Sequence, residues 1–284
     1  AIEILNTPDD QLDTLIERAG ILRKKYKGNR VSIHILTNVR SGNCTQDRTY
    51  CAQSCRSDAD IDTYKWVDDD KLYNDNDFVN EYHLSRHCIG LSGMGFTDAD
   101  IEQLAGRIRK MKETGTHLCC SIGFLTEKQA RMLKDAGLDR INHNLNSSRN
   151  YYSHICTTHT FDQRVENIHM LQRLGFEICS GGIIGMGESK EDVVDMLLEL
   201  KEINPEALPI NFLLPIPGTP LGDQDISGLT YEYGMKVLCL ARLLVPQSDI
   251  RCAAGREVYF KGHEKELLSV VDSPVIFKFY FLSQ

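Results

Sequence analysis

Short β-rich segments alternate with longer amphipathic segments along the chain, at a spacing of about thirty residues. Strands are expected at 31–38, 87–91, 117–122, 140–145, 177–184, 208–214, 250–253 and 275–279. Helices are expected at 98–114, 127–136, 161–174, 190–203 and 231–244, each after a residue that can cap its first turn: Thr97, Thr126, Thr160, Ser189 and Thr230. Eight strands with interleaved helices predict an α/β protein with a (β/α)8 barrel of the TIM type.

Nothing in the sequence resembles a linker between two halves. The 284 residues are therefore expected to form one barrel domain, 1–284, with an N-terminal helix over 1–28 as its cap. No apolar run approaches the roughly 20 residues that span a bilayer. The net charge of −8 argues against nucleic acid or an anionic membrane as a partner. The acidic run 68–70 is expected to be a solvated turn.

The chain has ten cysteines but no apolar signal-peptide core. A domain of this length does not need disulfides for stability, so a reducing compartment is expected, either the cytoplasm or the mitochondrial matrix. Six cysteines fall into two sets, one in a single loop and one along expected strands: Cys44, Cys51 and Cys55, then Cys88, Cys119 and Cys179. This layout is typical of an iron–sulfur protein.

Strand periodicity separates the remaining thiols. Adjacent strand residues point to opposite faces, so only one of Cys119 and Cys120 is expected to face the barrel interior. Cys156, Cys239 and Cys252 lie in helical or outer contexts and are expected to be small buried side chains.

Glycines cluster at 181–187, and prolines with a glycine occupy 215–220. Small residues after a strand let a ligand approach the backbone closely. Tight packing and rigid turns explain the same composition, so both interpretations stay open.

From about Val31 onward, the sequence resembles the biotin synthases, which are radical S-adenosylmethionine (SAM) enzymes. The matching stretches are 42–54, 88, 119–130, 142–145, 157–164, 179–188, 209–213, 218–221 and 251–257. The resemblance implies a barrel with a [4Fe-4S] cluster that binds and cleaves SAM. It also implies a deeper [2Fe-2S] cluster that donates sulfur to dethiobiotin.

The resemblance implies that Cys88, Cys119, Cys179 and Arg251 ligate the deep cluster. Thiolates are ordinary cluster ligands, whereas a guanidinium is normally a charged donor. Arg251 has the alternative role of a charge that faces the substrate or an interior carboxylate.

The SAM-cluster motif of the family is C-x3-C-x2-C, and this chain departs from it. Cys44 matches the first cysteine, and Tyr50 with Cys51 match the aromatic residue and the third cysteine. Arg48 stands at the second position and cannot replace a thiolate. Cys55 is the candidate replacement, which gives C-x6-C-x3-C. The alternatives are a labile cluster on two thiolates, loss of the cluster, or an error in the sequence at position 48.

The resemblance also implies the ligand contacts. Asn144 and Arg164 match residues that hold the nucleoside and the methionyl carboxylate of SAM, and a guanidinium suits a carboxylate. Asn146 stands where the family has an aspartate toward the ribose, so weaker SAM binding is expected. Asn142 and Asn211 are expected to contact dethiobiotin through amides that both donate and accept. Capping of strand ends is the alternative for the asparagines.

The predicted function is therefore sulfur insertion into dethiobiotin by a 5′-deoxyadenosyl radical mechanism. Flavodoxin or ferredoxin as electron donor and a homodimeric state are further implications of the resemblance. Three alternatives remain. One is a degenerate, non-catalytic paralogue, and another is a different radical SAM enzyme, such as a methylornithine synthase or a hydrogenase-maturation relative. The third is a plain barrel enzyme that uses Glu188 and Glu257.

Overall fold

The computed structural model describes residues 1–276. In this part of the chain, nine strands form one sheet, and every pair of neighbouring strands is parallel. The strands are β1 (His34–Arg40), β2 (Arg86–Leu91), β3 (Leu118–Ser121), β4 (Arg140–Asn142), β5 (Glu177–Cys179), β6 (Gly182–Ile184), β7 (Ala207–Phe212), β8 (Asp249–Cys252) and β9 (Ser273–Ile276). β1 pairs with both β2 and β9, and β5 pairs with β7, so the sheet closes into a ring.

The expected TIM-type barrel is confirmed, with one strand divided. The segment 177–184 forms β5 and β6, and both pair with β7, so they share one of the eight strand positions. The break falls at Ser180 and Gly181. A Cβ on Gly181 would lie 1.8 Å from the carbonyl oxygen of Pro209, so β7 approaches too closely for any other residue. The last expected strand begins at Ser273, and its remainder, 277–279, lies outside the described residues.

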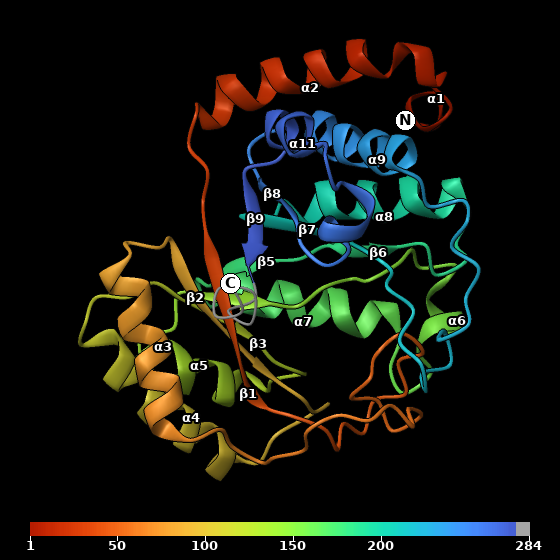
Figure 1. Ribbon diagram of the computed structural model, residues 1–284. Coiled ribbons are helices and arrows are strands. Elements are labelled where there is room, and N and C mark those ends of the chain that lie inside the picture. The colour runs from red at the N-terminus through yellow and green to blue at the C-terminus, as the bar shows by residue number, and fades with distance from the viewer. Residues whose placement is uncertain (277–284) are drawn as a thin grey trace.

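Helices cover the outside of the barrel (Figure 1). Those that follow strands are α3 (Asp69–Glu81), α4 (Asp98–Lys112), α5 (Glu127–Asp135), α6 (Tyr152–Ile155), α7 (Phe161–Arg173), α8 (Lys190–Ile203), α9 (Tyr231–Leu244), α10 (Arg256–Tyr259) and α11 (Glu264–Val270). The five predicted caps all accept a hydrogen bond from a backbone N–H of the first turn. The acidic run 68–70 opens α3 and is not a free turn, because carboxylates favour the positive end of a helix.

The N-terminal segment contains α1 (Ile2–Leu5), a 3₁₀ turn (Asp9–Gln11) and α2 (Leu12–Lys27). In Figure 1, α2 lies across the outside of α9 and α11, and it contacts both helices. Arg23 fixes its C-terminal end: Nε donates to the carbonyl of Val271 at 2.8 Å and lies 3.3 Å from Asp272. No helix within residues 1–276 is long and apolar enough to cross a membrane.

Two sets of buried apolar residues result from the closed sheet. The larger set lies between strands and helices and includes Cys120, Cys156, Cys239 and Cys252. The smaller set consists of Cys119, Cys179 and Ala207, with Cys88 packed against it. Cys119 and Cys120 therefore face opposite sides of the sheet, as strand alternation predicts.

Candidate active site

A cavity of about 400 Å³ opens at the carboxyl ends of β1 to β4, where a TIM-type barrel places its chemistry. The loop 41–54 forms part of its wall. Among the residues expected at a site, the cavity brings together Cys44, Cys51, Asn142, Asn144, Asn146 and Arg164, and Arg48 joins them. Tyr50, Cys55 and Asn211 are not part of its lining.

Backbone hydrogen bonds fold the cysteine loop back on itself. The N–H of Cys44 donates to the carbonyl of Gln53 at 3.2 Å, and the N–H of Cys55 donates to the carbonyl of Gln46 at 3.2 Å. Cys44 is buried and Cys51 is partly buried. Burial raises the pKa of the Cys51 thiol. Two thiols of the loop thus face the cavity, and the raised pKa keeps that of Cys51 neutral at neutral pH unless a cation binds it.

Cys55 lies on the other side of this loop. Its side chain is exposed, and Sγ lies 3.7 Å from the carbonyl oxygen of Thr45. It lines an outer depression that Cys44 also borders. Cys55 is not part of the lining of the cavity that holds Cys44 and Cys51.

Arg48 extends into the cavity from the loop. Its Nε is buried without a hydrogen-bond partner among the described residues. Burial alone would lower the pKa of Arg48, but the neighbouring Tyr50 and Cys51 side chains raise it. The guanidinium therefore stays charged, close to a second buried guanidinium, that of Arg164.

Asp47 anchors the loop to the segment 156–159. Its carboxylate accepts hydrogen bonds from the backbone N–H of Thr157 at 2.9 Å and of Thr158 at 3.1 Å. The hydroxyls of Thr157 and Thr158 and the thiol of Cys156 also donate to it. Burial alone would raise the pKa of Asp47, but the hydrogen bonds, led by those from Thr157, hold it well below the ordinary aspartate value.

Arg164 is held on the opposite wall. Its Nε donates to the carbonyl of Asn144 at 2.6 Å, and one terminal nitrogen lies 3.0 Å from Nε2 of His159. Burial, followed by the nearby Arg164, lowers the pKa of His159 to about 3. His159 is therefore neutral and accepts the hydrogen bond from Arg164. The face of Phe124 lies 5.8 Å from the guanidinium carbon.

The asparagines of the cavity lie beside the glycine segment 181–187. The side-chain oxygen of Asn144 accepts from the N–H of Gly181 at 3.1 Å, which leaves its amide NH₂ toward the cavity. Asn146 is buried and has a left-handed backbone with φ of 74°, a conformation that asparagine tolerates.

Asn142 and Asn211 have different surroundings. Asn142 lines the cavity, and its Nδ2 donates to Sγ of Cys179 at 3.3 Å. Asn211 uses both ends of its amide on backbone groups: Nδ2 donates to the carbonyl of Gly182 at 3.2 Å, and Oδ1 accepts from the N–H of Ala254 at 3.1 Å. Asn142 thus joins the cavity to the interior thiols, whereas Asn211 braces the backbone.

Below the cavity, three thiols meet inside the barrel. Cys88 pairs with Cys119 in the β2–β3 register. A hydrogen bond from Cys119 lowers the pKa of Cys88. A hydrogen bond from Cys179 would lower the pKa of Cys119, but its contact with Cys88 and its burial raise it to about 12. Cys88 is therefore the thiol of this group that ionises first.

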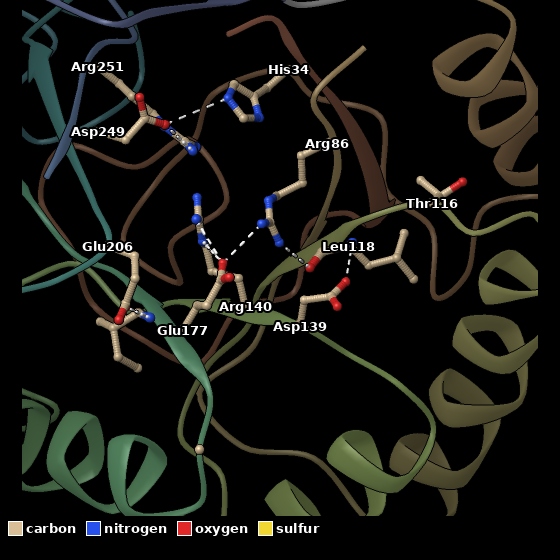
Figure 2. A network of polar contacts seen from close by, with 12 residues as sticks. His34, Arg86, Thr116, Leu118, Asp139, Arg140, Glu177, Glu206, Asp249 and Arg251 are labelled. Carbon is tan, nitrogen blue, oxygen red and sulfur yellow. Dashed lines mark hydrogen bonds and ion pairs between the residues drawn. The ribbon is translucent and has the colours of Figure 1, made fainter. Parts of the chain in front are cut away.

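A network of charged groups lies at the lower end of the barrel (Figure 2). Nε and one terminal nitrogen of Arg251 donate to the same oxygen of Asp249, at 3.1 and 2.9 Å. Arg86 and Arg140 share one oxygen of Glu177, at 2.9 and 2.8 Å. Burial alone would lower the pKa of Arg251, but Cys179 and Asp249 raise it above the ordinary value. The positive charges of Arg251 and Arg140 favour the thiolate forms of the nearby Cys119 and Cys179.

His34, also drawn in Figure 2, lies among these groups. Burial, followed by Arg251, Arg140 and Arg86, lowers its pKa to about 2, so its imidazole is neutral. No role was expected from the sequence for His34, Asp47 or His159. His34 and Asp47 have partners distant in sequence, whereas His159 contacts the nearby Tyr152 and Arg164. The available signals were the position of Asp47 within the cysteine loop and that of His159 within the matching stretch 157–164.

Comparison with known proteins agrees with this geometry. A model of the "Radical SAM superfamily" matches residues 38–200, and one of the "Biotin and Thiamin Synthesis associated domain" matches residues 209–279. The biotin synthase of Halalkalibacterium halodurans is 40% identical over 263 residues, which are 92% of this chain and 78% of that protein. The biotin synthase of Anoxybacillus flavithermus is also 40% identical, over 92% of this chain and 79% of its own.

Solved structures support the fold. A methylornithine synthase superposes with a TM-score of 0.78 at 18% identity, over 97% of this chain and 85% of its own. The FeFe-hydrogenase maturase HydG from Carboxydothermus hydrogenoformans superposes with a TM-score of 0.81 at 15% identity, over 96% of this chain and 65% of its own. At these identities the likeness concerns the barrel alone. The family match and the identity to curated relatives go further: this chain belongs to the radical SAM superfamily and, within it, to the biotin synthases.

Proposed function

We propose that this chain converts dethiobiotin to biotin, with SAM bound in the cavity and a [2Fe-2S] cluster on the thiols below it. One observation carries this proposal. Asn142 lines the cavity and also donates to Cys179, so the ligand cavity and the three-thiol site adjoin through a single side chain. A reaction between a bound substrate and a sulfur site needs this proximity.

The deep site fits a cluster of two irons. Three inward thiols touch one another, and Arg251 adds a positive charge beside them. Thiolates are the usual protein ligands of such clusters.

Bound in the cavity, SAM and a four-iron cluster would supply a carbon-centred radical, and a two-iron cluster on Cys88, Cys119 and Cys179 would supply sulfur. The chain's own contribution is to bind and orient the substrates. Arg164 binds the methionyl carboxylate through the terminal nitrogen that His159 does not occupy. The NH₂ of Asn144 donates to the nucleoside, and Asn146 accepts from the ribose. The amide of Asn142 contacts the ureido ring of dethiobiotin. We propose Asn211 as a second contact with dethiobiotin. This contact requires Asn211 to give up one of its hydrogen bonds to the backbone.

The cysteine loop fits its cluster incompletely. Cys44 and Cys51 face the cavity, and Arg48 stands at the second cysteine position of the family motif. We propose Cys55 as the third thiolate. To reach the cavity it must give up its backbone hydrogen bond to Gln46 and turn through the loop. Tyr50, whose hydroxyl is buried without a partner among the described residues, packs beside this site.

Three further assignments rest on the family resemblance. We propose flavodoxin or ferredoxin as electron donor and a homodimer as the assembly. We also propose the cytoplasm, or the mitochondrial matrix in a eukaryote, as the compartment. The ten free thiols suit a reducing environment.

Anaerobic reconstitution followed by Mössbauer spectroscopy tests the proposal, together with an assay for 5′-deoxyadenosine and biotin. Both cluster types with biotin formation are expected. Cys119→Ala should remove the two-iron signal. The matched control Cys239→Ala, which alters a buried thiol outside the barrel on α9, should keep it. A two-iron signal without SAM cleavage would support the degenerate paralogue, and absence of both signals would refute the proposal.

A further inference from the structure

The ring of His159 contacts Arg164 through one nitrogen and two hydrogen-bond partners of Asp47 through the other. The exposed fraction of the residue is 7%. Burial, followed by the charge of Arg164, lowers the pKa of His159 to about 3, so the imidazole is neutral. A neutral imidazole carries one hydrogen, on Nδ1 or on Nε2, and its other nitrogen is an acceptor. The partners on the two sides of the ring decide which nitrogen carries the hydrogen.

On the Nδ1 side, the carboxylate of Asp47 sets the direction of the hydrogen bonds. It is ionised, because the hydrogen bonds led by those from Thr157 lower its pKa against the effect of burial, and an ionised carboxylate only accepts. The hydroxyl of Thr158 and the thiol of Cys156 each have one hydrogen, which they donate to Oδ1 of Asp47 at 3.1 and 3.3 Å. Their oxygen and sulfur atoms lie 3.3 and 3.4 Å from Nδ1 of His159. Both atoms therefore accept from this nitrogen, which assigns the hydrogen to Nδ1.

The Nε2 side gives the same assignment independently. A guanidinium has donors only, and one terminal nitrogen of Arg164 lies 3.0 Å from Nε2 of His159. The hydroxyl oxygen of Tyr152 lies 2.8 Å from the same nitrogen. A hydrogen on Nε2 would face the guanidinium N–H, so Nε2 must be the bare nitrogen. The two sides of the ring thus agree on one tautomer.

This tautomer fixes the orientation of the Arg164 guanidinium. Nε of Arg164 donates to the carbonyl of Asn144 at 2.6 Å, and Nε2 of His159 holds one terminal nitrogen. A planar group held at two of its three nitrogens has little freedom to rotate. Arg164 also lines the cavity. Its remaining terminal nitrogen is therefore oriented before a ligand arrives, which favours a charge-assisted hydrogen bond to a carboxylate.

We propose that His159 is a positioning residue for the carboxylate of SAM and acts through Arg164. Asp47, through Thr158 and Cys156, fixes the tautomer in which His159 accepts from Arg164. A continuous path of hydrogen bonds then joins the cysteine loop to the carboxylate contact. This inference rests on the proposed function, because it requires SAM in the cavity.

Nitrogen NMR of the unaltered chain tests the tautomer. The protein is produced with ¹⁵N-histidine, and spectra are recorded before iron is added. The signals of His159 are those that disappear in His159→Gln. A protonated Nδ1 and a bare Nε2 are expected. The opposite tautomer, or an imidazolium with both nitrogens protonated, would overturn the proposal. This measurement requires neither a cluster nor biotin formation.

Binding of SAM to the reconstituted chain, measured by anaerobic equilibrium dialysis, tests the positioning role. The matched ligand is decarboxylated SAM, which keeps the nucleoside, the sulfonium and the amine. His159→Phe keeps a ring but has no acceptor, so SAM should bind about tenfold more weakly, as for the loss of one charge-assisted hydrogen bond. The affinity for decarboxylated SAM should change by less than about twofold. Equal losses for the two ligands would indicate a structural role and overturn the proposal.

His159→Gln tests whether the acceptor itself matters. The side-chain oxygen of glutamine can accept from Arg164 near the position of Nε2, so SAM affinity should stay within about threefold of that of the unaltered chain. An affinity as low as that of His159→Phe would contradict the proposal. The control is His169→Gln, which changes an exposed histidine on α7 that contacts Gln172. It should bind both ligands as the unaltered chain does. If His159→Phe does not fold, His159→Gln and the NMR measurement still decide the outcome.

The results separate this inference from the proposed function. If the unaltered chain binds SAM but forms no biotin, the proposed function fails and the role of His159 stands on the binding data. If it forms biotin while His159→Phe binds both ligands with unchanged affinity, only the present inference fails. If the unaltered chain does not bind SAM, both fail.

Discussion

Replacing Asp47 tests whether the cysteine loop depends on the carboxylate that anchors it. In Asp47→Ala the backbone N–H groups of Thr157 and Thr158 lose their acceptor. The side chain of Asp47 is only 10% exposed, so water reaches these groups poorly. At about 1.5 kcal/mol for each buried N–H left unpaired, the two together give about 3 kcal/mol. Loss of the two hydroxyl contacts adds a smaller destabilisation, because a hydroxyl can turn toward another acceptor.

Urea unfolding followed by circular dichroism measures this loss as a fall in the transition midpoint at constant m-value. In a chain of this size, 3 kcal/mol corresponds to a fall of about 6 °C in melting temperature. Asp60→Ala is the control, because Asp60 is an exposed carboxylate on the same segment. It should change stability by less than about 0.5 kcal/mol.

The pH dependence of stability follows from the direction of the Asp47 pKa shift. The hydrogen bonds depress this pKa in the folded state. The carboxylate therefore stabilises the fold fully above its unfolded value, near 3.8, and this contribution is lost as pH falls through the lower folded value. The difference in unfolding free energy between the unaltered chain and Asp47→Ala should be constant from pH 7 to about 5 and should decrease in more acidic solution. Equal midpoints for the Asp47 and Asp60 variants at pH 7 would refute the argument.

Three further substitutions test other parts of the site. Arg48→Cys restores the family motif and should raise iron content and SAM cleavage after reconstitution; unchanged values would show that Arg48 is not a defect. Asn146→Asp adds a charged acceptor and should tighten SAM binding by about fivefold, or about 1 kcal/mol, in calorimetric titration. An unchanged dissociation constant would count against this contact. Gly181→Ala should cost at least about 3 kcal/mol in urea unfolding, because its Cβ would meet the Pro209 carbonyl, whereas Gly228→Ala, with open space around it, should be mild. Equal losses would refute the packing argument.

Local sequence signals predicted much of the fold. The Thr and Ser caps gave the starts of five helices because the capping side chain and the first-turn N–H groups are adjacent in sequence. Alternation placed Cys119 inside and Cys120 outside for the same reason. The break between β5 and β6 was not predicted, since it arises from the approach of Pro209, which is distant in sequence.

The site was predictable only in part, because its members depend on different kinds of information. Resemblance supplied candidate residues, and the structure brings six of them to one cavity. The resemblance could not show that both ends of the Asn211 amide bind backbone groups or that Asp47 binds segment 156–159. The place of His34 beside Asp249 and Arg251 could not be predicted either, because these residues are distant from it in sequence.

Two features of the cysteine loop oppose a third thiolate ligand: the outer position of Cys55 and the charged side chain of Arg48. Their energetic costs differ. Turning Cys55 inward breaks a few loop hydrogen bonds, each worth about 1 kcal/mol net. Metal–thiolate binding in small metal sites releases about 10 kcal/mol or more, so loop rearrangement is the smaller obstacle. The charge of Arg48 persists after rearrangement, because Tyr50 and Cys51 raise its pKa although it shares the cavity with Arg164. A buried cation beside Cys51 stabilises its thiolate but competes with iron for the same space. Charge and volume at position 48, more than the direction of Cys55, therefore decide whether this cavity holds its cluster.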